Sequence, residues 1–190
     1  MAAEGRAVVV RRTARYVAED IWDTPNDGNR YEVIDGDLYM TPPPVVAHQW
    51  PSGQLHISIG GYLRVHPIGV ILAAPIGLTL DGLNGLQPDL VYVSNERRHI
   101  IGDRGIVGTP DLVVEILSPS TQARDRGIKW RRYAAAGVVH YWIVAPLTRT
   151  LEEYVLVDGG YELRGTHGAG AVFRPALFPG LEIPIDALWS

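Results

Sequence analysis

Cysteine is absent from the 190-residue sequence, and lysine occurs only once. Without cysteine the chain can form no disulfide, no thiolate zinc site and no cysteine nucleophile, as is typical of proteins from a reducing cytoplasm. Long apolar runs are also missing, because no stretch reaches the roughly 20 residues of a membrane-spanning helix. Residues 7–10 are apolar but too few for a secretory signal. We therefore expect a cytoplasmic protein without a membrane segment.

An excess of positive charge is missing as well, since the formal net charge is -4 at pH 7. This value argues against a protein that coats nucleic acid through bulk electrostatics, but it is compatible with an enzyme that has a local basic groove. The length, with 46% hydrophobic and 20% charged residues, predicts one globular domain with a sizeable core. Residues 1–15 show no periodicity, so we expect a flexible lead-in followed by a single domain over residues 16–190.

The scarcity of lysine draws attention to Lys129, which stands against sixteen arginines. Arginine replaces lysine in most surface roles, so a retained lysine suggests a position that needs a compact ammonium group rather than a planar guanidinium. Two structural alternatives stay open. Compositional bias can leave one lysine on a solvated face by chance, and Asp125 lies four residues earlier, where it could form an exposed helical ion pair with Lys129.

Hydrophobic periodicity and turn residues predict alternating helices and strands. Helices are predicted over residues 17–22, 48–66 and from about 121 to 136, and strands over 30–34, 37–40, 70–80, 87–93, 110–117, 138–144, 151–157 and 161–163. Asp-Gly pairs at residues 35–36 and 158–159 supply the tight turns of two hairpins. The tail after residue 163 is predicted to have little regular structure. The order of elements indicates an α/β sandwich around a mixed sheet.

Two acidic residues lie in apolar segments of strand character. Side chains alternate along a strand, so Glu115 shares a face with Val113 and Leu117, and Asp89 interrupts the strand predicted over residues 87–93. A buried carboxylate needs a partner or a cation, and two carboxylates on neighbouring strands repel each other unless a cation lies between them. Hard carboxylate oxygens favour Mg²⁺ or Mn²⁺ over zinc. For Asp89, capping of a turn at a strand end is the structural alternative.

Several segments follow one another in an order and spacing that is specific as a set. They are YEVIDGDL at 31–38, His48, QPDLV at 87–91, PDLVVEILSPST at 110–121, DRGIKWRRY at 125–133 and HYWIV at 140–144. Together they resemble the Uma-type restriction endonuclease family, a branch of the PD-(D/E)XK nuclease superfamily, over about residues 13 to 157. The resemblance implies an α/β fold with a restriction-endonuclease-like core. In that core a mixed sheet is flanked by helices, with extra hairpins towards both ends and a divalent metal at the sheet end.

The resemblance also implies roles for individual residues. Asp89 and Glu115 would be metal ligands, the backbone carbonyl of Ile116 would be a third, and Lys129 would hold or polarise the attacking water. The superfamily lysine normally stands two residues after the acidic residue, where this chain has Leu117. Lys129 would therefore be a migrated lysine that reaches in from the next helix.

Glu32 and His48 match further family positions. Glu32 would add a carboxylate to the site and His48 would face it. The structural alternatives are an ion pair within the hairpin for Glu32 and a polar contact at a helix start for His48. The last predicted helix also carries four basic residues that could meet phosphates or face solvent: Arg124, Arg126, Arg131 and Arg132.

These features predict a Mg²⁺- or Mn²⁺-dependent phosphodiester hydrolase that acts on DNA. A first alternative is a nucleic-acid or protein binding module that keeps the fold without catalysis, which Leu117 and the acidic net charge favour. A second is a phosphodiesterase acting on a small nucleotide. A homodimer is expected from the family and from the symmetry of duplex substrates.

Overall fold

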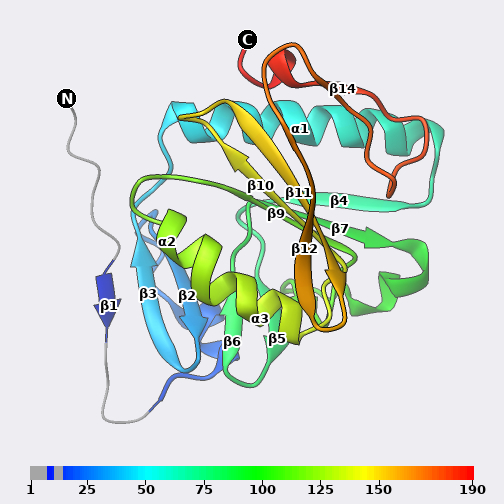
Figure 1. Cartoon of the computed structure of the whole chain (residues 1–190). Helices are drawn as coiled ribbons and strands as arrows, with labels where there is room; N and C mark the ends of the chain where they lie inside the picture. Colours follow the sequence, from blue (N-terminus) through cyan, green and yellow to red (C-terminus); the bar gives the residue numbers. More distant parts are fainter. Residues whose placement is uncertain (1–7, 11–14) are drawn as a thin grey trace.

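The computed structural model describes residues 8–10 and 15–190, which form two six-stranded mixed sheets and one two-stranded sheet (Figure 1). The first sheet has the order β1-β3-β2-β6-β5-β8 and the second has the order β12-β11-β10-β9-β7-β4. The first sheet consists of β1 (Val8–Val10), β2 (Arg30–Ile34), β3 (Asp37–Thr41), β5 (Leu78–Asp81), β6 (Asn84–Leu86) and β8 (Ile106–Val107). The second consists of β4 (Gly69–Ala73), β7 (Leu90–Ser94), β9 (Leu112–Ile116), β10 (His140–Ala145), β11 (Thr150–Val157) and β12 (Gly160–His167). Strands β13 (Val172–Phe173) and β14 (Ile183–Pro184) pair with each other.

The helical elements include one long helix, α1 (Val46–Val65). A second helical region consists of α2 (Gln122–Arg124), a π-helical segment (Asp125–Lys129) and α3 (Trp130–Ala135). Short 3-10 helices cover Ala18–Asp23, Asn95–Ile100 and Ile185–Leu188. Among the described residues, no helix is both long enough and apolar enough to cross a membrane.

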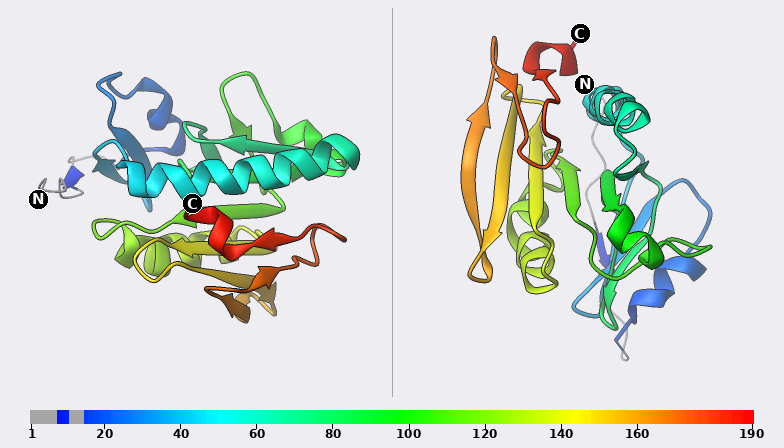
Figure 2. Two further views of the ribbon diagram at one scale, coloured as in Figure 1. Left: turned by 90° about the horizontal axis from the view of Figure 1, so that it is seen from above. Right: turned by 90° about the vertical axis from the view of Figure 1, so that its right-hand side faces the viewer.

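The second sheet lies between two hydrophobic layers (Figure 1 and Figure 2). On one face, α1 contributes Leu55 and Ile59, and the C-terminal segment contributes Phe178, to a cluster with alternate residues of β9. On the other face, Tyr133 of α3 and Leu78 of the first sheet pack against the remaining residues of β9. Strand β9 pairs with β7 on one side and β10 on the other. The nearly continuous apolar run at residues 112–116 is therefore a central strand, as its composition predicts.

Most predicted elements are confirmed, and three differ. The hairpin of β2 and β3 turns at Asp35 and Gly36, which have φ angles of 55° and 79°. The single strand predicted over 70–80 is wrong, because β4 and β5 belong to different sheets and the chain crosses between them at residues 74–77. The helix predicted to run to residue 136 is interrupted by the π-helical segment. The tail contains β13, β14 and a short 3-10 helix.

Part of the predicted lead-in is ordered into the first sheet. Residues 8–10 form β1 and pair antiparallel with β3, whereas residues 1–7 and 11–14 lie outside the described residues. The sequence does not predict this edge strand, because three consecutive valines show no alternation of apolar and polar residues that would distinguish a strand from a short apolar run.

Gly85 in β6 provides a test of the packing between the first sheet and the 3-10 helix Ala18–Asp23. A Cβ atom at this position would collide with the backbone carbonyl oxygen of Ala18 and lie 3.0 Å from Ile21 Cγ2. We expect Gly85→Ala to lower the free energy of unfolding by about 1–3 kcal/mol in denaturant titrations, because the backbone atom cannot yield as a flexible side chain would. Gly53→Ala in α1 is the control, since a Cβ there would meet no atom of the described residues within 4 Å apart from its chain neighbours and the adjacent backbone of its own helix. That change should be neutral or stabilise by up to about 1 kcal/mol.

Candidate active site

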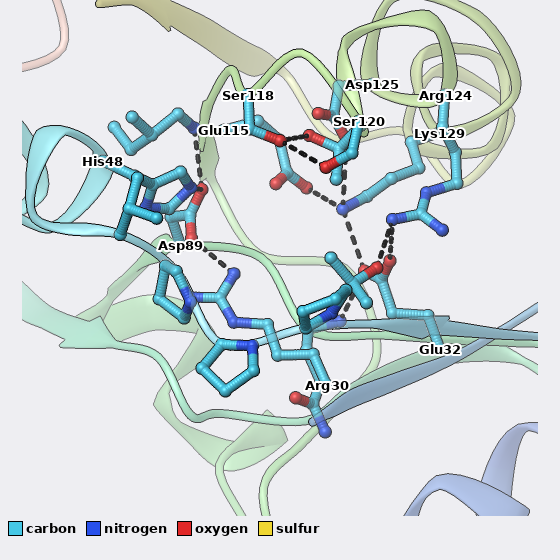
Figure 3. Close-up of a pocket in the computed structure, with 18 residues that line it drawn as sticks. Arg30, Glu32, His48, Asp89, Glu115, Ser118, Ser120, Arg124, Asp125 and Lys129 are labelled. Carbon is cyan, nitrogen blue, oxygen red and sulfur yellow. Dashed lines mark hydrogen bonds and ion pairs between the residues drawn. The ribbon is translucent and has the colours of Figure 1, made fainter. Parts of the chain in front are cut away.

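A cavity of about 360 Å³ lies where β2, β3, the start of α1, the ends of β7 and β9 and the second helical region meet (Figure 3). The structure brings together here every residue for which the family resemblance implies a catalytic or metal-binding role: Glu32, His48, Asp89, Glu115, Ile116 and Lys129. The cavity is also lined by Arg30, Thr41, residues 42–45, Gln87, Ser118, Ser120, Thr121, Arg124 and Asp125.

Asp89 lies just before β7 and not within a strand, so the strand predicted over residues 87–93 is wrong at its start. The Asp89 carboxylate connects three elements. Its Oδ2 accepts a hydrogen bond from the Ile116 backbone N–H at 2.7 Å and lies 3.2 Å from His48 Nε2. Its Oδ1 accepts a hydrogen bond from Arg30 Nη1 at 2.6 Å. Burial alone would raise the pKa of Asp89, but the hydrogen bonds from His48 and Ile116 and the positive charge of Arg30 hold this pKa below its ordinary value. Asp89 is therefore ionised and linked to β9, rather than only capping a local turn.

Glu115 projects from the central strand β9 into the cavity. Its Oε1 forms an ion pair with Lys129 Nζ at 2.6 Å and accepts a hydrogen bond from the Tyr133 hydroxyl at 2.7 Å. Burial and the negative charges of Asp125 and Asp89 together raise the pKa of Glu115 to about 8, although the positive charge of Lys129 opposes them. In Figure 3 the Glu115 carboxylate lies between Lys129 and Asp89. The two predicted metal ligands thus line one cavity.

Lys129 lies in the π-helical segment and is 2% exposed. Its Nζ is 2.6 Å from Glu115 Oε1, 2.8 Å from Glu32 Oε1 and 3.5 Å from Asp125 Oδ1. The exposed ion pair with Asp125 is wrong as an explanation, because both side chains are buried and Asp125 is the most distant of the three carboxylates. Burial alone would lower the pKa of Lys129, but the three carboxylates raise it above its ordinary value. The side chain is therefore a positively charged donor.

Glu32 and His48 also contact the other predicted residues. Glu32 accepts a hydrogen bond from the Gln87 backbone N–H at 3.0 Å in addition to its contact with Lys129. The alternative of an ion pair within the hairpin is wrong, because the cation comes from the second helical region. His48 lies in the first turn of α1, so its contact with Asp89 is a polar contact at a helix start as well as a contact within the site.

The sequence did not single out Arg30 or Tyr133 as site residues. Arg30 lies two residues before Glu32 on β2, so strand alternation places both side chains on one face and could have suggested it. Tyr133 follows Lys129 by four residues, which is also the spacing of one helix face. Neither spacing distinguishes a site residue from a residue that only packs beside one. The sequence does not show whether that face of the strand or helix points into a cavity.

The donor set fits a hard divalent cation that keeps water ligands. Among the described residues, no three His, Cys, Asp or Glu side chains form a group that could enclose a metal. Mg²⁺ is commonly held by one or two carboxylates and completed by water and substrate oxygens, which Asp89, Glu115 and the Ile116 carbonyl could provide. Burial and the neighbouring carboxylates raise the pKa of Glu115, and a cation bound beside it would favour its ionised form. An ion here would have to share Asp89 Oδ1 with Arg30 or displace its guanidinium.

The state of Glu115 makes the stability of the metal-free protein depend on pH. Its pKa of about 8 in the folded chain lies above the ordinary value of a glutamate, so the folded state holds a proton that the unfolded chain releases. The stabilising contribution is therefore complete below the ordinary pKa and is lost as the pH rises towards 8. We expect the melting temperature in chelator to fall between pH 5 and pH 8. The Glu115→Gln variant should show a smaller fall, and an equal fall in both proteins would contradict the assignment.

Comparisons with known proteins agree with this fold. A protein-family model described as "Uma2: Putative restriction endonuclease" matches residues 18–186. The curated "Uncharacterized protein slr1290" of Synechocystis sp. (strain ATCC 27184 / PCC 6803 / Kazusa) is 29% identical over 129 residues, covering 60% of this chain and 68% of that protein. A crystal structure described as "a putative nuclease belonging to DUF820" from Anabaena variabilis has a TM-score of 0.74 at 18% identity, covering 91% of this chain and 97% of that one. At this identity, the structural likeness shows a shared fold.

Proposed function

Because the chain belongs to the Uma2 family of putative restriction endonucleases, we propose that it is a metal-dependent nuclease that hydrolyses phosphodiester bonds in DNA. The observation that carries the proposal is the convergence of Asp89, Glu115 and Lys129 in one buried cavity. Two carboxylates and an ammonium group that line one cavity are the components that this hydrolysis requires. The family match supports the nuclease role, and the site geometry supports these three residues as its centre.

Each residue has a role that follows from its contacts. Mg²⁺ or Mn²⁺ held by Asp89, Glu115 and the Ile116 carbonyl would neutralise charge on the scissile phosphate and lower the pKa of a bound water. Lys129 would orient the attacking water and donate to the charge that develops in the transition state. It would not act as a base, because its neighbouring carboxylates keep it protonated.

The remaining cavity residues position this centre. Glu32 would hold the ammonium of Lys129 towards Glu115, since its Oε1 is also fixed by the backbone of Gln87. Arg30 and His48 would fix the orientation of Asp89.

Chelation separates the proposal from metal-independent alternatives. Supercoiled plasmid incubated with the protein and Mg²⁺ or Mn²⁺ should become nicked or linear, and an excess of EDTA should prevent this because two carboxylates alone cannot activate water. Readdition of Mg²⁺ to the chelated sample should restore cutting and serves as the control. Cutting that persists in EDTA would overturn the metal requirement.

A binding module without catalysis is the second candidate. It is favoured by two ion pairs, because Arg30 already neutralises Asp89 and Lys129 already contacts Glu115 without a metal. This candidate predicts a gel shift with DNA but no chelator-sensitive cutting of plasmid. A phosphodiesterase for small nucleotides would instead cleave bis(p-nitrophenyl) phosphate and leave plasmid intact.

We also propose that two protomers associate when both strands of a duplex are cut, since a two-fold dimer matches the symmetry of such a substrate. Sedimentation of the protein with and without duplex DNA tests this. A monomer in both samples would contradict it.

A further inference from the structure

Arg124 lines the same cavity but is only partly satisfied by its neighbours. Its Nη2 donates to Thr41 Oγ1 at 2.7 Å and lies 3.6 Å from Glu32 Oε2. Its Nε and Nη1 are buried and have no hydrogen-bond partner among residues 8–10 and 15–190. The Arg124 side chain is 9% exposed, and buried charged donors are costly when they remain unpaired. The guanidinium also lies over the Tyr39 ring, with Cζ 5.2 Å from the ring centroid, so two of its N–H groups remain without a hydrogen-bond acceptor in the wall of the cavity.

The other arginines of the second helical region are directed elsewhere. Arg126 forms a two-point ion pair with Glu152, with distances of 2.7 and 2.6 Å. Arg132 is ion-paired as well, and Arg131 is exposed. None of these three lines the cavity. Of the four basic residues that the sequence marks as candidates for phosphate contact, the structure therefore directs Arg124 to the site.

Hydroxyl groups line the cavity together with Arg124. Ser118 Oγ lies 3.0 Å from Ser120 Oγ and 3.1 Å from Thr121 Oγ1, and all three residues belong to the wall that leads from β9 to α2. A guanidinium group and hydroxyl groups are common donors to phosphate oxygens. Phosphate is also the group that the substrate of a nuclease offers repeatedly.

We propose that Arg124, with the hydroxyls of Ser118, Ser120 and Thr121, binds a second phosphate of the substrate, beside the phosphodiester that is cut. This inference rests on the proposed function and specifies its substrate class. A chain with at least two phosphates fills both subsites, whereas an ester with a single phosphate fills one. The site thereby selects oligonucleotides over small nucleotide esters.

A pair of small ligands tests the subsite. The first is the thymidine dinucleotide, which has one phosphodiester, and the second is the same dinucleotide with an added phosphate at its 5′ or 3′ end. Calorimetry in Ca²⁺, with intact ligand verified by chromatography, gives the affinity of each. For the native protein we expect one of the phosphorylated forms to bind about 10- to 100-fold more tightly than the unphosphorylated form, the range expected for hydrogen bonds to a charged group.

Three variants identify the residue responsible. In Arg124→Ala the phosphorylated and unphosphorylated dinucleotides should bind with similar affinity, and in Arg124→Lys part of the difference between them should remain. Arg131→Ala removes the same charge outside the cavity, so the difference in affinity between the two ligands should be the same as in the native protein. If neither terminal phosphate strengthens binding, or if the gain persists in Arg124→Ala, the subsite is refuted. A purely structural role for Arg124 would lower the affinity for both ligands equally and would also refute it.

The outcome is independent of cleavage. If the added phosphate strengthens binding through Arg124 in a protein that does not cut plasmid, the second phosphate site is supported and the nuclease proposal is refuted. If the protein cuts plasmid but the added phosphate does not strengthen binding, the nuclease proposal is supported and the second phosphate site is refuted.

Discussion

Glu115→Ala is expected to abolish plasmid cleavage at every Mg²⁺ concentration. The carboxylate lies on the central strand β9 and is 2% exposed, so no other side chain can move into its place without disturbing the core. Removing it takes away one of the two proposed carboxylate ligands and a partner of Lys129. The measurement is plasmid nicking over a Mg²⁺ and Mn²⁺ series, with metal binding followed separately by calorimetry.

Two further variants make this result interpretable. Glu115→Gln keeps the shape of the side chain and the acceptor for Tyr133, so it should fold and bind the metal weakly while cutting remains lost. Glu153→Ala, on β11 and outside the cavity, should cut like the native protein. Normal cleavage by Glu115→Ala, or equal loss in Glu153→Ala, would refute the role of Glu115.

Lys129→Ala is expected to reduce the cleavage rate by about 100- to 1000-fold, the range known for loss of one preorganised donor to transition-state charge. The variant should still bind Mn²⁺, because Lys129 is not a ligand. It should also be destabilised by about 3–5 kcal/mol near neutral pH, since Glu32, Glu115 and Asp125 would lose the cation that they share. Single-turnover cleavage and denaturant titration measure the two effects.

Lys129→Arg separates catalysis from stability. It restores a positive charge in the cavity, so it should recover part of the lost stability, but its planar guanidinium cannot take the position of a compact ammonium between Glu32 and Glu115. Cleavage should therefore remain low. A Lys129→Ala variant that is folded and cuts at the native rate would eliminate the migrated-lysine role and leave the site with its carboxylates alone.

Local features explain what could be predicted. The hairpin turn at Asp35 and Gly36 depends on φ angles that few residues adopt, so its sequence is informative by itself. The chemistry of Glu115 is detectable because a carboxylate within a run of Val, Leu and Ile needs an explanation at any location in a fold. The division of residues 70–80 between two sheets could not be predicted, since both strands are apolar and the partner of each is distant in the chain.

The sequence by itself predicted the central strand β9 and identified the two candidate carboxylates and Lys129, the one lysine of the chain. These inferences depend only on residue type and on neighbours in the sequence. Only the tertiary structure decided what these residues contact. Lys129 meets Glu32 across 97 positions of sequence, and Arg30 meets Asp89 across 59. Periodicity reports which face of an element is apolar but not which distant element lies opposite it. The ionisation of the site, and the unpaired donors of Arg124 within it, are therefore properties of the folded chain.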